Sequence, residues 1–275
     1  MTGPQPAKYG PVVDVLDRPW GRLGYRVMGD PTAPRLLYVH GSGGRLADVE
    51  PMLDRWAKRF RLVAFDHRGM GTSDVPTAPY TMADVTDDVV ALLDAVGWPT
   101  CRILGVSYGG MVAQHVAAQI PDRVERLVLA CTSSGGVGGS SYPLHELYAL
   151  PEAERRRVLP TILDTRFTPD HLARDARARA IVEARTDRTT TLDPVALRLQ
   201  MDARHGHDAY DLLPRITSPV LVAVGATDGI APPANGEHIA ERLPDATLVT
   251  FDGGHLFLVQ DRTATPTLQG FLARP

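Results

Sequence analysis

Short apolar runs rich in β-branched residues alternate with amphipathic helical patterns along most of this chain of 275 residues. Such continuous apolar runs are typical of parallel strands that are buried on both faces. Strands that alternate with helices are joined by right-handed crossovers, which build a doubly wound sheet. We therefore expect an α/β fold with a mostly parallel, eight-stranded sheet. The expected strands are 12–16, 23–28, 36–39, 62–65, 103–106, 127–130, 220–224 and 247–251.

The first two expected strands differ from the others, because Gly and Pro punctuate them and they lack continuous apolar runs. This pattern predicts an antiparallel hairpin at one edge of the sheet. The remaining strands are separated by helical patterns, as expected for crossover connections. The expected helices are 49–60, 82–96, 110–119, 234–243 and 262–271.

The alternation stops once, between residues 135 and 213, where helical periodicity continues without a strand. A helical insertion after the sixth strand is expected to form a lid, so we divide the chain into a core of residues 1–134 and 214–275 and a lid of residues 135–213. The glycine-rich stretch 135–141 predicts a flexible hinge at the start of the lid. Two groups of arginines in the lid are balanced by nearby acidic residues, which favours a solvated helix surface over an anion site. The arginines are Arg155, Arg156, Arg157, Arg174, Arg177 and Arg179, and the acidic residues are Glu152, Glu154, Asp170, Asp175 and Glu183.

Apolar side chains of the lid have two possible roles, lining a substrate pocket or packing the lid onto the core, and the sequence leaves both open. They are Leu144, Leu147, Tyr148, Leu150, Leu159, Ile162, Leu163 and Phe167.

The composition gives no reason to expect nucleic acid or a membrane as a partner, because the formal net charge is −3 and no apolar run is long enough to cross a bilayer. Residues 1–11 lack the apolar segment of a signal peptide. The two cysteines, Cys101 and Cys131, have neither metal-binding nor redox spacing. We therefore expect a cytoplasmic protein. Its oligomeric state is not readable from the sequence.

The pentad Gly105-Val106-Ser107-Tyr108-Gly109 joins the expected strand at 103–106 to the helix at 110–119. A Gly-x-Ser-x-Gly sequence between a strand and a helix is typical of a strained turn that projects a nucleophilic serine from the sheet. A side chain at Gly105 or Gly109 would collide with the neighbouring strand or helix. The alternative is an ordinary loop serine that happens to be flanked by glycines. We expect Ser107 to be a nucleophile.

A serine nucleophile needs a base, and the base needs a carboxylate that orients it. Asp228 follows the expected strand at 220–224, and His255 follows the strand at 247–251 after two glycines. Because the carboxyl ends of parallel strands meet at one edge of a sheet, we expect Ser107, Asp228 and His255 to converge there. Asp252 is the competing carboxylate, but it lies too close to His255 in sequence to brace the imidazole from behind.

The other histidines are weaker candidates for the base. His40 opens the loop after the third expected strand and is expected to orient the main chain, and His67 lies in a charged turn that ties its own loop together. His205 and His207 lie in the lid, where they could only line a pocket.

A tetrahedral oxyanion needs two main-chain N–H donors aimed at one point. We expect one from Tyr108, the residue after the nucleophile, at the positive end of a helix. The other is expected from Ser42, in the glycine-rich run His40-Gly41-Ser42-Gly43-Gly44. Such runs also cradle phosphate, but no nucleotide-binding glycine pattern follows a strand here.

These motifs together resemble the α/β-hydrolase family over nearly the full length of the chain. The matching pieces are 40–43, 66–73, 105–109, 225–232 and 253–255. The resemblance implies Ser107, Asp228 and His255 as the catalytic residues, with no cofactor and no metal. Within the family, residues 131–135 and 253–258 are similar to intracellular polyhydroxyalkanoate depolymerases and 3-oxoadipate enol-lactonases, although Tyr108 stands where the depolymerases carry Trp.

The expected activity is hydrolysis of a small-molecule carboxylic ester or lactone by a serine esterase mechanism. C–C bond hydrolysis and cofactor-free perhydrolysis, as in haloperoxidase-like enzymes, use the same three residues and remain alternatives. A hydrolase-like protein that binds a ligand without turning it over is an alternative of a different class. Epoxide and haloalkane opening use an aspartate nucleophile, which Ser107 argues against.

Overall fold

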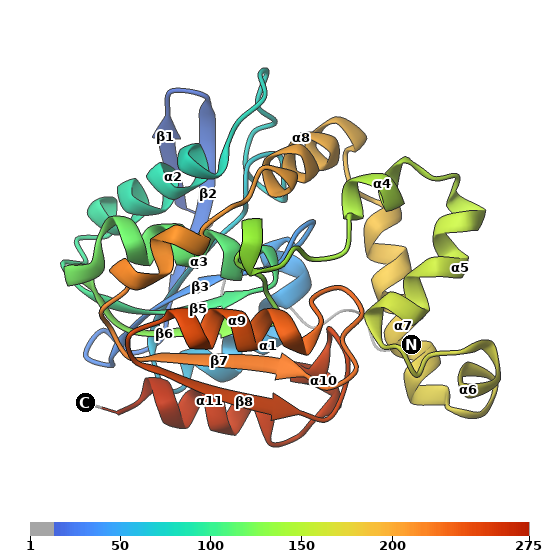
Figure 1. Cartoon of the computed structure of the whole chain (residues 1–275). Coiled ribbons are helices and arrows are strands. Elements are labelled where there is room, and N and C mark those ends of the chain that lie inside the picture. Colours follow the sequence, from blue (N-terminus) through green and yellow to red (C-terminus); the bar gives the residue numbers. More distant parts are fainter. Residues whose placement is uncertain (1–13, 275) are drawn as a thin grey trace, which may run out of the picture.

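The computed structural model describes residues 14–274, which form one eight-stranded sheet with helices on both faces (Figure 1). The strand order is β1-β2-β4-β3-β5-β6-β7-β8. Strand β2 runs antiparallel to β1 and β4, and every other neighbouring pair is parallel. The strands are β1 Asp14–Arg18, β2 Gly21–Met28, β3 Arg35–Val39, β4 Arg61–Phe65, β5 Cys101–Val106, β6 Val124–Ala130, β7 Val220–Gly225 and β8 Ala246–Phe251. The predicted doubly wound sheet with an antiparallel edge hairpin is therefore confirmed.

The first strand extends beyond its predicted end, and its predicted start is not covered by the described residues. Residues 12 and 13, which were expected to begin it, lie outside the described residues, and β1 continues to Arg18. It pairs with β2 along its whole length, from Asp14 opposite Tyr25 to Arg18 opposite Gly21.

Two apolar layers bury the two faces of the sheet. Helices α2, α3 and α9 cover one face, and helices α1, α10 and α11 cover the other (Figure 1). The core helices are α1 Leu46–Ala57, α2 Met82–Ala95, α3 Tyr108–Gln119, α9 Pro233–Arg242, α10 Phe257–Gln260 and α11 Ala264–Leu272, with short 3₁₀ turns η1 Pro121–Arg123 and η3 Tyr210–Arg215. Among the described residues, no helix has both the length and the apolar character needed to cross a bilayer.

Helix α1 begins three residues earlier than its apolar pattern predicts, and Pro51 lies inside it. The reason is a contact that the local sequence does not reveal. The carboxylate of Asp66, at the end of β4, accepts a 2.7 Å hydrogen bond from the main-chain N–H of Leu46 and satisfies one of the free donors of the first turn.

The segment between β6 and β7 forms a helical insert beyond the carboxyl ends of the strands, where the arrows of β7 and β8 point (Figure 1). It contains η2 Gly136–Gly138, α4 Leu144–Ala149, α5 Glu152–Leu163, α6 Pro169–Arg174, α7 Ala176–Thr190 and α8 Pro194–His205. Of the eight apolar side chains expected to line a pocket or pack the insert, five are buried in one cluster with Met201 and with Ile230 of the core, and Tyr148 and Leu150 pack against that cluster. Packing is therefore their main role.

The glycine-rich start of the insert is a hydrogen-bonded turn. The N–H of Gly135 donates to the carbonyl oxygen of Gly139 at 3.2 Å, and Gly135 also forms an isolated β-bridge with Asp208. A Cβ at Gly135 would overlap the carbonyl oxygen of His207. Close packing against the end of the insert thus explains the glycine at this position.

A buried imidazole, His207, and a half-buried one, His115, join the end of the insert to α3. His207 Nε2 lies 3.0 Å from the carbonyl oxygen of Ser133, and His207 Nδ1 lies 3.1 Å from His115 Nε2. Because a carbonyl only accepts, Nε2 of His207 carries its proton and Nδ1 accepts from His115. Burial, with a smaller contribution from His115, lowers the pKa of His207 to about 3.

This lowered pKa predicts how stability depends on pH. An unfolded histidine has a pKa of about 6.5, so between that pH and about 3 the unfolded chain binds a proton that folded His207 does not. The stabilisation is complete above about pH 6.5 and is lost as the pH falls toward 3. We expect the urea midpoint of unfolding to decrease less with falling pH in His207→Gln, which keeps a donor for Ser133, than in the unaltered protein. An unchanged fall would contradict the assignment.

Candidate active site

Strand β5 passes into helix α3 through a turn that holds Ser107 in an unusual conformation. Its φ is +56° and its ψ is −117°, in a region that side-chain-bearing residues rarely adopt. The turn is fixed by a 2.8 Å hydrogen bond from the N–H of Ser107 to the carbonyl oxygen of Ala130. A Cβ at Gly105 would lie 2.5 Å from the carbonyl oxygen of Gly109, and one at Gly109 would overlap that of Val39. Both positions therefore require glycine.

The imidazole of His255 lies between the hydroxyl of Ser107 and the carboxylate of Asp228. Its Nε2 is 2.8 Å from Ser107 Oγ, and its Nδ1 is 2.8 Å from Asp228 Oδ2. The other carboxylate oxygen accepts hydrogen bonds from the N–H groups of Ile230 and Ala231 at 2.8 and 2.9 Å. These contacts orient the carboxylate, so that Nδ1–H donates to Asp228 and Nε2 accepts from the serine.

The loops after β7 and β8 carry Asp228 and His255 to the same edge of the sheet as Ser107. They are hydrogen-bonded to each other, because the N–H of Thr227 donates to the carbonyl oxygen of Gly253 at 2.9 Å. A Cβ at Gly225, the last residue of β7, would overlap the carbonyl oxygen of Gly254. The loops after β5, β7 and β8 thus bring together the three residues that the sequence predicted as a group, although Ser107 and His255 are 148 positions apart in the chain.

The competing carboxylate, Asp252, points away from this group. Its side chain is 79% exposed and forms a 2.8 Å ion pair with Arg166. No contact joins it to the imidazole of His255 within the described part of the chain.

The remaining histidines are engaged elsewhere. His40 Nε2 lies 2.8 Å from the carbonyl oxygen of Phe65, and its Nδ1 lies 3.0 Å from that of Gly41, so this ring braces the main chain as expected. His67 is fully buried, and burial lowers its pKa well below the ordinary value. The ring of His205 lies against His145 within the insert, with centroids 4.2 Å apart.

Two main-chain N–H groups near Ser107 are free to bind an oxygen. Among residues 14–274, neither Ser42 nor Tyr108 has an acceptor for its N–H. The next residue, Gly43, donates instead to the side chain of Gln200 in α8 at 2.7 Å, which fixes the loop. The Tyr108 N–H opens helix α3, where the helix dipole favours negative charge.

The side chain of Tyr108 takes no part in the site. It is fully buried, and its ring lies edge-on against His67 with centroids 5.0 Å apart. Tyr108, which stands where the depolymerases carry Trp, therefore lies in the core and does not line the cavity at Ser107.

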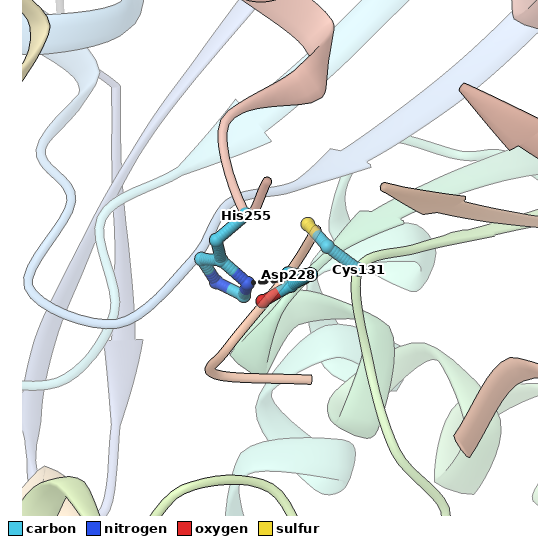
Figure 2. A group of neighbouring side chains, drawn as sticks. All are labelled: Cys131, Asp228 and His255. Carbon is cyan, nitrogen blue, oxygen red and sulfur yellow. Dashed lines mark hydrogen bonds and ion pairs between the residues drawn. The ribbon is translucent and has the colours of Figure 1, made fainter. Parts of the chain in front are cut away.

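Sequence patterns did not predict that Cys131 lies beside the acid. Figure 2 shows its sulfur near the carboxylate of Asp228, which faces the imidazole of His255, and the potential ligand atoms of the three lie within 4.8 Å of one another. Burial, with a smaller contribution from Asp228, raises the pKa of the Cys131 thiol well above its ordinary value. A metal needs a thiolate and a free imidazole nitrogen, whereas here the thiol stays protonated and Nδ1 is hydrogen-bonded to the carboxylate.

A second residue that sequence reasoning missed is Asp164, in the insert just after α5. Its side chain is fully buried. The carboxylate forms a bidentate ion pair with Arg166, at 2.9 and 2.8 Å, and accepts a 2.8 Å hydrogen bond from Gln260. Burial by itself would raise the pKa of the Asp164 carboxyl, but the hydrogen bonds from Arg166, Gln260 and Thr227 together lower it.

The Asp164 contacts extend to the loop that carries His255. The side-chain Nε2 of Gln260 donates to the carboxylate of Asp164. Its Oε1 accepts a 2.9 Å hydrogen bond from the main-chain N–H of Gly254. The N–H of His255 itself donates to the carbonyl oxygen of Leu163 at 2.6 Å. The insert therefore positions the histidine loop through two separate hydrogen-bonded routes.

A cavity of about 380 Å³ opens above Ser107 and is also lined by Ser42 and His255. Its walls are mostly apolar, and α1 and the chain around α10 supply several of the apolar side chains. Leu144 and Arg185 reach it from the insert. The arrangement presents a serine hydroxyl, an imidazole and two N–H donors to a space that suits a small organic molecule.

Comparisons with known proteins match nearly the whole chain. A family profile described as the alpha/beta hydrolase fold matches residues 34–181. The poly(3-hydroxyalkanoate) depolymerase of Ectopseudomonas oleovorans is 29% identical over 252 residues, 89% of this chain and 86% of that protein. The 3-oxoadipate enol-lactonase 2 of Acinetobacter baylyi is 25% identical over 242 residues, 88% and 89% of the two chains. The crystal structure of a hydrolase from Pseudomonas aeruginosa PA01 matches with a TM-score of 0.82 and 30% identity, covering 97% and 100%.

The geometry of the turn predicts that glycine is essential at position 109. We expect Gly109→Ala to lower the free energy of unfolding by about 3 kcal/mol or more, because the new Cβ meets main-chain atoms that cannot move aside. Gly270→Ala, at an exposed position in α11 where a Cβ meets nothing within 4 Å, should raise it by about 0.5–1 kcal/mol. Urea denaturation measures both. Equal midpoints for Gly109→Ala and the unaltered protein would contradict this reading.

The Gln260 bridge predicts a local effect on the histidine loop. Gln260→Ala leaves the Gly254 N–H without its acceptor and removes one of the hydrogen bonds to Asp164, which should cost about 1–3 kcal/mol and speed amide hydrogen exchange at Gly254 and His255. The matched control is Gln119→Ala on the exposed face of α3, whose side chain makes one 3.2 Å contact with Asp87. If exchange in the histidine loop is as slow in Gln260→Ala as in the control, the bridge has no positioning role.

Proposed function

This chain belongs to the α/β-hydrolase fold family, as its motifs predicted, and we propose that it hydrolyses a carboxylic ester or lactone through an acyl-enzyme on Ser107. The observation that carries the proposal is the position of one imidazole. His255 lies 2.8 Å from the hydroxyl that would attack and 2.8 Å from the carboxylate that would orient it. That is hydrogen-bond reach for the transfer of a proton.

In the first half of the proposed reaction, Ser107 Oγ attacks the carbonyl carbon while its proton passes to His255 Nε2. Asp228 keeps the other nitrogen protonated and stabilises the positive charge on the ring. The N–H groups of Ser42 and Tyr108 bind the oxygen that becomes negative. The tetrahedral intermediate then breaks its bond to the leaving oxygen, which takes the proton from Nε2 and departs as an alcohol.

In the second half, water takes the place of the serine hydroxyl. Nε2 of His255 removes a proton from the water as it attacks the acyl carbon, and the same two donors bind the oxyanion. The bond to Ser107 Oγ breaks, the serine recovers its proton, and the carboxylic acid leaves. With a lactone, the alcohol released in the first half stays attached to the acyl group, and the product is a hydroxy acid.

The names of two relatives support an ester-type substrate. One is called a depolymerase of poly(3-hydroxyalkanoate) and the other an enol-lactonase. The serine nucleophile of this chain and the largely apolar cavity suit such bonds. We further propose that residues 135–213 act as a lid, because Leu144 and Arg185 of the insert form part of the wall around the substrate.

The proposal predicts that the hydroxyl of Ser107 is indispensable. Ser107→Ala should reduce the turnover of p-nitrophenyl esters by at least about 100-fold, because no other group forms the acyl-enzyme. The assay follows release of p-nitrophenol over many turnovers. The control is Ser218→Ala, which removes a buried hydroxyl just before β7 and outside the cavity.

Two results would contradict the proposal. Ser107→Ala with more than about a hundredth of the original kcat/KM would place the chemistry elsewhere. A folded protein that retains esters without repeated turnover would instead be a ligand-binding member of the family.

A further inference from the structure

One cation faces the cavity above Ser107 from the insert. Arg185 lies on α7, seven residues after Ala178, on the face that also carries Ile181 and Val182. Ala178 is buried and the other three are half-buried, whereas Glu183 and Ala184 between them are exposed. An arginine thus occupies a position where the spacing of an amphipathic helix calls for an apolar side chain.

The guanidinium of Arg185 has no acidic partner among the described residues. Other arginines of the insert do have partners: Arg156 pairs with Glu152 at 2.7 Å, and Arg166 pairs with Asp164 and Asp252. Among the described side chains, Arg185 is thus an arginine of the insert that lines the cavity and lacks the ion pairs made by Arg156 and Arg166.

The other charges around the cavity do not neutralise Arg185. Asp48 of α1 also lines the cavity, but its carboxylate is held by Arg45 through contacts of 2.8 and 3.0 Å. A second cation, Arg55 of α1, is part of the same wall. The side chains lining the cavity thus leave an excess of positive charge in a mostly apolar space.

We propose that Arg185 binds a carboxylate at the far end of the acyl group, so that the preferred substrates are anionic esters or lactones. This inference rests on the proposed hydrolase function and adds the charge of its substrate. A planar guanidinium binds a carboxylate through two parallel hydrogen bonds, and such pairs are strongest where the surroundings are apolar. Binding the substrate supplies the partner that the half-buried cation lacks in the protein itself.

The position of α7 is fixed from its other end, which makes Arg185 suited to selecting a substrate. Arg177, in the first turn, donates to the carbonyl oxygens of Val259 and Gln260 at 2.6 and 3.2 Å. These carbonyls end α10, which lies directly after the loop of His255. Helix α7, which carries Arg185, is thereby hydrogen-bonded to α10, which follows the loop of His255.

The test compares two p-nitrophenyl esters of equal length, the hexanoate and the adipate monoester, which differ in a terminal methyl or carboxylate. The measured quantity is the ratio of kcat/KM for the adipate to that for the hexanoate. Arg185→Met should lower the ratio by about 10- to 100-fold, the range for a hydrogen bond to a charged group. Arg185→Lys should keep part of the preference for the adipate, because lysine retains the positive charge but lacks the planar guanidinium that makes two parallel hydrogen bonds.

The matched control is Arg157→Met on the exposed side of α5, which should leave the ratio unchanged. Turnover of the hexanoate reports that each variant is folded and active, and Arg185→Gln provides a second neutral replacement. If the hexanoate is hydrolysed but both neutral variants keep the original ratio, the carboxylate site is refuted and the hydrolase function stands. If the folded protein hydrolyses neither ester, the proposed function fails and the inference fails with it.

Discussion

The approach of helix α3 to the ends of β3 and β5 is the constraint on which the rest of the site depends. The main chain at Gly109 lies so close to Val39 that no Cβ fits between them. This contact forces the tight turn that raises Ser107 above the sheet at φ +56°. The same turn brings the free N–H of Tyr108 to the start of a helix beside the hydroxyl. One packing contact thus sets the position of both the proposed nucleophile and a proposed donor for the oxyanion.

The helical insert does more than cover the cavity, because it also holds the loop of the base. Buried Asp164 binds Gln260, which binds the N–H of Gly254, and the carbonyl of Leu163 takes the N–H of His255. A shift of the insert must therefore disturb the hydrogen bonds that position the imidazole. The proposed substrate selection by the insert and the position of the proposed base are therefore coupled through these few side chains.

The parts that sequence predicted well are those whose signal is local. Strands, helices and the group of Ser107, Asp228 and His255 follow from apolar runs, glycines and strand ends, and the structure has them at one edge of the sheet. Asp164 and Arg185 were missed because each lies in a polar part of the insert and meets its neighbours only through the fold; Gln260, for example, lies 96 positions after Asp164. The earlier start of α1 was missed for the same reason, since a carboxylate from another strand end caps it.

Labelling with a fluorophosphonate most directly tests whether the imidazole of His255 activates Ser107 for covalent chemistry. Tandem mass spectrometry of the labelled protein identifies the modified side chain, and the time course gives the rate. We predict a single adduct on Ser107, formed at least about 100-fold more slowly in His255→Ala. An adduct on another residue, or an equal rate without the imidazole, would contradict the account.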